Sequence, residues 1–226
     1  MTTTTADRGT PRFASVIFDV DSTLTALEGI DWLATLRGDR VAREIAALTD
    51  QAMAGAVSLE SVYARRLELI RPTRAEIAAL GLAYIDAVQR GARALCAVLA
   101  AAGTELTIVS GGLREAILPL ARYLDIPAVQ VHAVSLCFDA RDRYLSLDGE
   151  QPLSTQRGKP AMLHTLALRR PFVMVGDGAT DAAVRGVADG FIAYTGVTRR
   201  PTVVAVADAE APDFATLHAL LVHPDS

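Results

Sequence analysis

From Gly91 onward, segments with helical periodicity alternate with short apolar runs that have the length of strands. Regular alternation of this kind predicts parallel strands joined by right-handed crossover helices. The pattern predicts helices at 92–102, 113–124, 160–169 and 180–188, and strands at 105–109, 128–132, 172–175, 191–194 and 203–206. It is interrupted at 134–138 and 144–147, where two apolar runs flank a polar turn and predict a β-hairpin. The chain is therefore expected to be an α/β protein with a parallel sheet.

The stretch between the first two strands is too long for a simple crossover. Four segments after the first strand place apolar residues at three- and four-residue spacing, at 29–37, 41–54, 59–70 and 74–89. So much helix between two strands predicts an inserted bundle. We expect residues 29–90 to form a four-helix cap over the sheet edge that carries Asp19. Residues 13–28 and 91–226 are expected to form the core, and residues 1–12 a disordered tail.

Composition argues against several classes of protein. The chain has 226 residues, a hydrophobic share of 51% and a formal net charge of -4, which favours a soluble enzyme over a nucleic-acid-binding protein. The first residues lack the features of a signal peptide, and no run approaches the ~18 apolar residues of a membrane span. Cys96 and Cys137 are expected to be small core residues in a reducing compartment. These features predict a cytoplasmic protein without a membrane or nucleic-acid partner.

Two carboxylates, Asp19 and Asp21, stand at the end of the first apolar strand. An ionised carboxylate beside a buried strand is costly, so a pair of them needs a shared proton or a cation such as a divalent metal ion. Residues two apart in an extended chain point the same way, which would let one carboxylate attack a phosphate while the other handles the proton. The same residues are also ordinary turn formers after a strand, so the pair alone leaves both interpretations open.

Three further polar fragments follow, each at a strand end or a helix start. Ser110-Gly111-Gly112 closes one apolar strand, Lys159 precedes an expected helix, and residues 176–181 close another apolar strand. The carboxyl ends of parallel strands share one crevice in an open α/β sheet, and ligands bind in that crevice. Lys159 is the only lysine in the chain, which favours a functional role over a solvated surface position. We expect all these fragments to converge with the first pair of carboxylates.

With these fragments in this order, the chain resembles the haloacid dehalogenase superfamily, and within it the phosphoserine phosphatase family, over nearly its whole length. The resemblance implies a Rossmann-like core beneath the helical cap. It also implies a magnesium-dependent phosphatase that hydrolyses O-phospho-L-serine to L-serine and phosphate through an aspartyl-phosphate intermediate. In that reaction Asp19 would be the nucleophile, and Asp21 would act first as the acid and then as the base.

The resemblance further implies which residues hold the metal ion and the phosphate. Mg²⁺ would be held by the Asp19 and Asp177 carboxylates and by the backbone carbonyl of Asp21. Asp181 would hydrogen-bond metal waters or orient the lysine. The expected phosphate ligands are Ser110, Gly111 with its N–H at a helix start, and Lys159.

Substrate contacts are implied by segments in and near the cap. Glu28 matches the family glutamate that meets the substrate ammonium group. Arg66 matches the arginine that holds the substrate carboxylate, with its neighbour Arg65 left as the alternative. Met53 and Thr180 are the further expected contacts. A cation site and an anion site beside the phosphate describe a phosphorylated amino acid.

Two other functions stay open from the sequence. A phosphatase for another small phosphorylated metabolite would differ only in the cap pocket, because the core motifs are common to phosphatases of many small molecules. A receiver-like signalling module also accepts phosphate on an aspartate at a strand end, but it needs neither Asp21 nor an inserted cap and would keep its phosphate. The oligomeric state stays open too, with a homodimer as one outcome.

Overall fold

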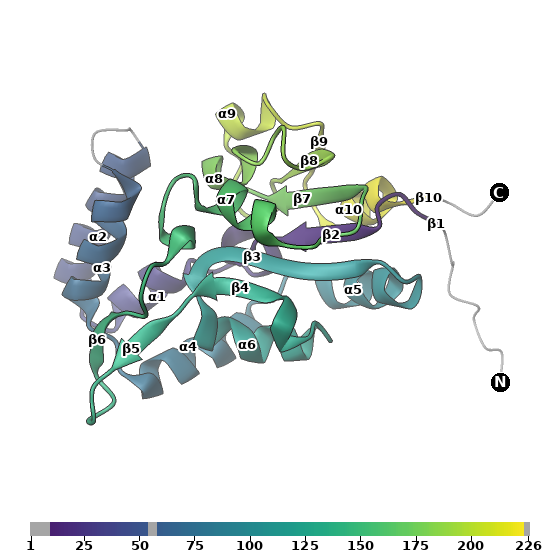
Figure 1. Ribbon diagram of the computed structural model, residues 1–226. Coiled ribbons are helices and arrows are strands. Elements are labelled where there is room, and N and C mark those ends of the chain that lie inside the picture. Colours follow the sequence, from purple (N-terminus) through teal and green to yellow (C-terminus); the bar gives the residue numbers. More distant parts are fainter. Residues whose placement is uncertain (1–9, 54–57, 224–226) are drawn as a thin grey trace.

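The computed structural model describes residues 10–53 and 58–223. Within that part of the chain, six parallel strands form one sheet in the order β4-β3-β2-β7-β8-β9 (Figure 1). In chain order, β2 comes first, β3 and β4 follow on one side of it, and the other three strands follow on the opposite side. A parallel sheet with helical connections confirms the predicted α/β class. The strands are β2 (Ser15–Phe18), β3 (Glu105–Leu113), β4 (Val131–Val134), β7 (Phe172–Gly176), β8 (Gly190–Tyr194) and β9 (Ala209–Ala211).

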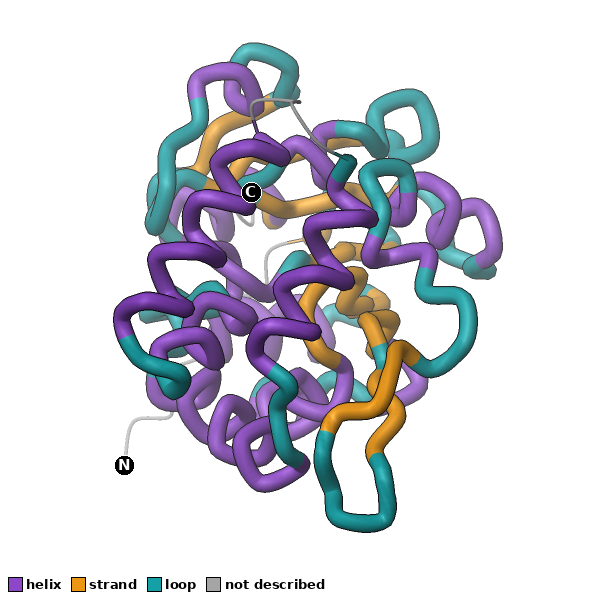
Figure 2. The backbone as a smooth tube through the Cα atoms, turned by 90° about the vertical axis from the view of Figure 1, so that its left-hand side faces the viewer, coloured by secondary structure: helices purple, strands orange, loops and turns teal. Residues whose placement is uncertain are grey.

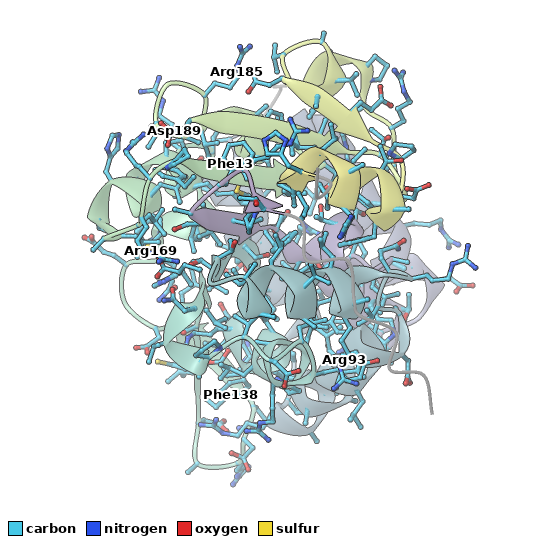
Figure 3. All side chains as sticks on the ribbon, turned by 90° about the vertical axis from the view of Figure 1, so that its right-hand side faces the viewer. Phe13, Arg93, Phe138, Arg169, Arg185 and Asp189 are labelled. Carbon is cyan, nitrogen blue, oxygen red and sulfur yellow. The ribbon has the colours of Figure 1, made fainter. Side chains whose placement is uncertain are left out.

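The central strands are apolar because the sheet is covered on both faces. Every residue of β2 and β7 is buried, and their continuous apolar runs are typical of parallel strands between two layers of helices. Figure 3 looks onto the N-terminal ends of the strands, where Phe13, Arg169 and Asp189 lie. The carboxyl ends point to the opposite side of the molecule. The helices of the core are α5 (Ala92–Ala101), α6 (Arg114–Tyr123), α7 (Gly158–Thr165), α8 (Ala179–Ala182), α9 (Pro201–Val204) and α10 (Phe214–Leu221).

Four of the five described α-helices between β2 and β3 lie toward the carboxyl ends of the strands, whereas α5 belongs to the core (Figure 1). Helices α2 and α3 stand side by side at this end of the molecule, in front in Figure 2. Helix α4 packs against α6 of the core, and Gly81 permits the approach, because a Cβ there would lie 3.0 Å from Pro119 Cγ. The treatment of residues 29–90 as a separate cap domain stays a prediction. These helices are α1 (Gly29–Thr35), α2 (Asp39–Met53), α3 (Leu59–Ile70) and α4 (Arg74–Asp86).

An ion pair between Arg37 and Glu76 links the end of α1 to the first turn of α4. Arg37 donates hydrogen bonds to both oxygens of Glu76, at 2.7 and 2.6 Å, and to the Ile70 carbonyl at 2.7 Å. Glu76 also closes a capping box with Thr73, which satisfies backbone donors at the start of α4. The hydrogen bond from Arg37 lowers the pKa of Glu76 to about 2. Glu76 is therefore ionised throughout the neutral pH range.

The predicted β-hairpin is present and lies beside the cap. Strands β5 (Leu136–Phe138) and β6 (Tyr144–Leu147) pair antiparallel, at the lower left of Figure 1. The Tyr144 N–H donates to the Pro72 carbonyl at 2.9 Å, in the turn between α3 and α4. The hairpin is thus hydrogen-bonded to the turn between the last two helices of the expected cap.

The last predicted strand, 203–206, is wrong. Helix α9 occupies residues 201–204, and the edge strand β9 comes later. Pro201 favours this helix because its φ is already helical and its missing N–H needs no partner in the first turn. Val203 is buried and Val206 is exposed. Only part of the apolar run therefore packs against the core, whereas a central strand would be buried along its whole length.

The predicted disordered tail extends too far. Thr10–Pro11 form β1, which pairs antiparallel with β10 (Val222–His223). The Arg12 N–H also donates to the Leu221 carbonyl at 2.9 Å. These backbone hydrogen bonds hold residues 10–12 against the end of the described chain, on the side away from the cap (Figure 1). Residues 1–9 lie outside the described part.

Both cysteines are free thiols. Cys96 is buried in α5, and Cys137 is half-buried in β5. Burial raises the pKa of the Cys96 thiol to about 12, so it stays protonated and packs as a small apolar residue. Within residues 10–53 and 58–223, no helix is both long and apolar enough to span a bilayer.

Candidate active site

Polar residues gather where the strand order reverses. Because β2 has β3 on one side and β7 on the other, the crossovers diverge from it, and ligands of open α/β sheets bind at such a point. A cavity of about 310 Å³ lies there, next to the cap. Its lining brings together predicted site residues from six segments: Asp19, Asp21, Glu28, Arg66, Ser110, Gly111, Lys159, Asp177 and Thr180. A second depression, of about 690 Å³, lies at the start of α5, away from these residues, and includes Arg93 (Figure 3).

Lys159 lies between two buried carboxylates. Its Nζ is 2.5 Å from Asp181 Oδ1 and 3.0 Å from Asp19 Oδ1, and its side chain is only 4% exposed. Burial alone would lower the pKa of Lys159, but Asp181 and Asp19 outweigh burial and raise that pKa. The lysine therefore keeps its positive charge beside Asp19. The contact with Asp181 matches one of the two arrangements expected for that residue.

Two glycines permit this close packing. A Cβ at Gly158 would lie 1.9 Å from the Pro152 carbonyl oxygen, so only glycine allows α7 to begin where it does. A Cβ at Gly176 would lie 2.2 Å from Asp181 Cγ, so glycine at the end of β7 makes room for that carboxyl group. Asp181 also accepts the Gly178 N–H at 2.9 Å, which closes the first turn of α8. The two glycines thus leave the space in which Asp181 and Lys159 form their ion pair.

Asp177 follows β7 and meets an arginine that sequence reasoning missed. Its Oδ1 accepts the Thr23 hydroxyl at 3.3 Å, and its Oδ2 contacts Arg200 Nη1. Arg200 also donates to the Asp177 carbonyl at 3.3 Å. Arg200 immediately precedes α9, where a strand had been predicted, so no expectation had placed it near the site. It adds a second positive charge to this side of the cavity.

Three carboxylates are close enough to share a metal ion. One ligand oxygen from each of Asp19, Asp177 and Asp181 lies within 4.8 Å of the others, and all three residues are buried. Asp19 Oδ1, although near Lys159, has no hydrogen-bond partner among the described residues. Carboxylate oxygens are the ligands that hard divalent cations prefer. The donor set therefore fits a divalent metal ion.

Asp21 is held from the cap side of the cavity. Its Oδ1 accepts the Tyr84 hydroxyl at 2.6 Å and the Gly29 N–H at 3.0 Å. Burial and the neighbouring Glu28 carboxylate raise the pKa of Asp21 to about 8. At neutral pH this carboxyl group therefore carries a proton, as a general acid must.

Glu28 lies at the cavity wall, just before α1. Its Oε1 accepts the Ser22 hydroxyl at 2.6 Å. Ser22 has a φ of 52°, in the left-handed region that side chains disfavour, and this bend follows directly after the Asp19 and Asp21 strand end. Burial, and to a lesser degree the nearby Asp19 carboxylate, raise the pKa of Glu28.

The structure distinguishes between the two neighbouring arginines of α3. Arg66 lines the cavity, and its side chain is only 11% exposed. Its Nη2 is 2.5 Å from Asp31 Oδ1, and its buried Nε has no hydrogen-bond partner among the described residues. Arg65 is mostly exposed and makes loose ion pairs with Glu44 and Glu68 on the outer surface. Of the two, Arg66 is the one that can reach a bound ligand.

Ser110 and Gly111 lie within an extended strand. Strand β3 continues beyond them with an irregular register against β4, and α6 begins only at Arg114. The expectation that the Gly111 N–H stands at a helix start is therefore wrong. The Ser110 hydroxyl accepts the Gly112 N–H at 3.1 Å, and the Gly111 carbonyl accepts the Tyr63 hydroxyl at 2.8 Å. The cap thus contacts the expected phosphate loop directly.

Several residues that line or support the cavity had no sequence signal. They are Asp31, Tyr63, Tyr84, Gln156, Thr198 and Arg200. Tyr63 belongs to the apolar stripe of α3, so its pattern predicted a core residue and not a polar contact. Met53, an expected substrate contact, is the last residue of α2, and its side chain lies outside the described part.

A family model described as haloacid dehalogenase-like hydrolase matches residues 16–184, which include the strand-end carboxylates and the lysine. The chain belongs to the haloacid dehalogenase-like hydrolases. This hydrolase is 35% identical over 206 residues to phosphoserine phosphatase of Bos taurus, covering 90% of its own length and 91% of the bovine protein. It is 36% identical over 203 residues to the chloroplastic phosphoserine phosphatase of Arabidopsis thaliana, covering 86% of its own length and 67% of the plant protein.

A solved structure shares the fold of this hydrolase. The crystal structure of a phosphoserine phosphohydrolase-like protein from Francisella tularensis subsp. tularensis SCHU S4 superimposes with a TM-score of 0.79 at 28% identity. That match covers 91% of this hydrolase and 98% of the other chain.

Proposed function

We propose that this hydrolase converts O-phospho-L-serine to L-serine and phosphate through an aspartyl-phosphate intermediate. The observation that carries the proposal is the content of one cavity, which holds two strand-end carboxylates and the only lysine of the chain. Glu28 and Arg66 line the same cavity. The first group suits a phosphate monoester, and the second suits the ammonium and carboxylate groups of an amino acid.

Asp19 is the proposed nucleophile. One of its carboxylate oxygens attacks phosphorus, and the bond between phosphorus and the serine oxygen breaks as the new bond forms. Lys159 lies 3.0 Å from Asp19 Oδ1 and would stabilise the negative charge on the transferring phosphoryl group. Ser110 lies in the same cavity and offers its hydroxyl to a phosphate oxygen.

Asp21 is the proposed acid and base. In its protonated form it gives its proton to the serine oxygen as that oxygen leaves. It then takes a proton from the water that attacks the aspartyl phosphate, which releases phosphate and returns Asp21 to its protonated form. The pKa of about 8, raised by burial and by Glu28, supports the first of these steps.

Magnesium is the proposed cofactor. The carboxylates of Asp19 and Asp177 and the backbone carbonyl of Asp21 would hold it, and Asp181 would hydrogen-bond beside it. When bound, Mg²⁺ supplies positive charge to the phosphate oxygens. The proposal is supported by the three buried carboxylates within 4.8 Å of one another.

Arg66 and Glu28 are the proposed recognition residues for the amino acid. Asp31 holds one end of the Arg66 guanidinium, which leaves the buried Nε without a partner and available to a substrate carboxylate. A charged hydrogen bond of this kind contributes about 1.5–3 kcal/mol, which corresponds to roughly ten- to a hundred-and-fifty-fold in kcat/KM. Glu28 would meet the substrate ammonium group.

The test compares phosphoserine with phosphoethanolamine, which lacks the carboxylate. Arg66→Ala should lose roughly ten- to a hundred-and-fifty-fold in kcat/KM on phosphoserine and little on phosphoethanolamine. Arg65→Ala is the matched control, because Arg65 is the neighbouring arginine on the outer surface. An equal loss on both substrates would mean that Arg66 supports the cap instead. A wild-type preference for a sugar phosphate or another metabolite would reject the phosphoserine assignment.

The cellular setting belongs to the same proposal. A cytoplasmic location in serine biosynthesis is supported by the two free thiols, which suit a reducing compartment. Whether the chain forms a homodimer is a question for size-exclusion chromatography with light scattering.

A further inference from the structure

Tyr84 reaches into the site from a helix that none of the expected motifs includes. It lies on α4, is fully buried, and donates its hydroxyl proton to Asp21 Oδ1 at 2.6 Å. That distance lies at the short end of the range for an O–H···O hydrogen bond. The phenol is the donor of this bond, so it occupies one acceptor position of Asp21 Oδ1.

The chain makes space for this contact with a glycine. A Cβ at Gly29 would lie 2.0 Å from the Tyr84 hydroxyl oxygen and 3.3 Å from Leu80 Cδ2. Any side chain at this position would therefore displace the phenol. The Gly29 N–H donates to the same oxygen, Asp21 Oδ1, at 3.0 Å. Helix α4, which carries the phenol, packs closely on core helix α6 at Gly81.

The two oxygens of Asp21 are therefore in different surroundings. A carboxyl oxygen has two lone pairs in the plane of the group, and Oδ1 already accepts two donors. Oδ2 lies on the other side, toward the expected phosphate loop. A Cβ at Gly112 would lie 3.2 Å from Asp21 Oδ2 and 3.3 Å from Ser110 Oγ, so Oδ2 and the serine hydroxyl border the same space.

We propose that Tyr84 is a positioning residue that, with the Gly29 N–H, fixes the Asp21 carboxyl group so that Oδ2 is the atom that transfers the proton. This inference rests on the proposed function, in which Asp21 is the acid and base. The proton on Oδ2 passes to the serine oxygen as the P–O bond breaks, and Oδ2 later takes a proton from the attacking water. Oδ1 keeps its two hydrogen bonds throughout, so the group does not rotate between the two steps.

The test uses two substrates whose leaving groups differ in their need for an acid. Serine leaves as a poor leaving group and needs the proton, whereas p-nitrophenolate leaves without one. The value of kcat/KM reports the steps up to formation of the aspartyl phosphate, so it isolates the acid role from the later base role. Acetyl phosphate, whose leaving group is acetate, takes the place of p-nitrophenyl phosphate if the wild type does not cleave the aryl ester.

Tyr84→Phe should lose several-fold, up to about ten-fold, in kcat/KM on phosphoserine, since it removes one of the two hydrogen bonds that hold the Asp21 carboxyl group, and should change little on p-nitrophenyl phosphate. Tyr194→Phe is the matched control. Tyr194 is also a buried tyrosine that donates to a side chain, Gln89 Oε1 at 3.1 Å, but it lies on β8 outside the cavity lining. In this control, kcat/KM on both substrates should stay unchanged. Thermal melts of both variants measure any loss of stability.

The outcomes separate this inference from the proposed function. Asp21→Asn should show the same selective loss as Tyr84→Phe, and more strongly. If Asp21→Asn loses nothing on phosphoserine, the acid role of Asp21 fails. If Asp21→Asn loses activity while Tyr84→Phe does not, or if Tyr84→Phe loses equally on both substrates, the positioning role of Tyr84 is overturned. Should Tyr84→Phe fail to fold, Gly29→Ala tests the same contact by displacing the phenol.

Discussion

Replacing Lys159 with methionine would test how much the buried ion cluster contributes to stability. The variant keeps the length of the side chain but removes the charge between Asp19 and Asp181. Side-chain exposures are 4% for the lysine, 11% for Asp19 and 0% for Asp181, so water cannot compensate the carboxylates that remain. Breaking a buried pair in this way costs about 3–5 kcal/mol. With a urea m-value of about 2–3 kcal/mol/M, the unfolding midpoint should fall by about 1–2.5 M.

Urea titrations in the presence of a chelator measure this effect without a contribution from bound metal. Lys159→Met/Asp181→Leu should recover much of the loss, because it also removes a buried carboxylate that no longer has a positively charged partner. Arg143→Met is the surface control. Its ion pair with Asp139, at 2.8 Å, lies at the surface, where water and salt screen it, and should contribute little to stability. If Lys159→Met costs no more than this control, the buried cluster does not stabilise the fold as argued.

The loss in Lys159→Met should also depend on pH. Burial raises the pKa of Asp181 to about 7 even though Lys159 opposes the shift, so removing the lysine should raise that pKa further. A carboxyl group whose pKa is raised on folding favours the folded state at low pH, and this contribution is lost as the pH rises through the raised pKa. The difference from wild type should therefore be larger at pH 8 than at pH 5. A difference that does not change over this range would contradict the assignment of an unpaired buried carboxylate.

Two further predictions concern the cap and the metal site. Glu76→Gln should reduce the free energy of unfolding by about 1 kcal/mol at pH 7, because Arg37 loses a charged acceptor that is partly exposed. Since Arg37 lowers the pKa of Glu76 from 4.5 to about 2, this stabilisation should be present above pH 4.5 and lost toward pH 2. Equal losses of stability in thermal melts at pH 7 and pH 2 would contradict this prediction. Asp177→Asn should abolish measurable Mg²⁺ binding in calorimetry. Asp21→Asn should retain Mg²⁺ binding, because Asp21 would contribute only its backbone carbonyl. Wild-type Mg²⁺ affinity in Asp177→Asn would count against the proposed ligand set.

The sequence alone determined the features that depend on neighbouring residues in the chain. Apolar runs that end in aspartate placed Asp19, Asp21 and Asp177 at strand ends, and the parallel order then brought those ends together. Helical periodicity predicted the inserted helices, and the two apolar runs around a polar turn predicted the hairpin. The run at 203–206 could not be assigned in this way, because four apolar residues fit a buried strand and one turn of helix equally well.

Only the tertiary structure decided which side chains meet across the cavity. The contact between Tyr84 and Asp21 depends on how α4 packs against α6, and the choice of Arg66 over Arg65 depends on the rotation of α3 about its axis. Arg200, at the N-cap of α9, reaches Asp177, which lies 23 residues earlier in the chain. These contacts join residues far apart in the chain, and their geometry is set by packing between elements. Local pattern determines where a polar side chain leaves its strand or helix, whereas packing determines which atom it then meets.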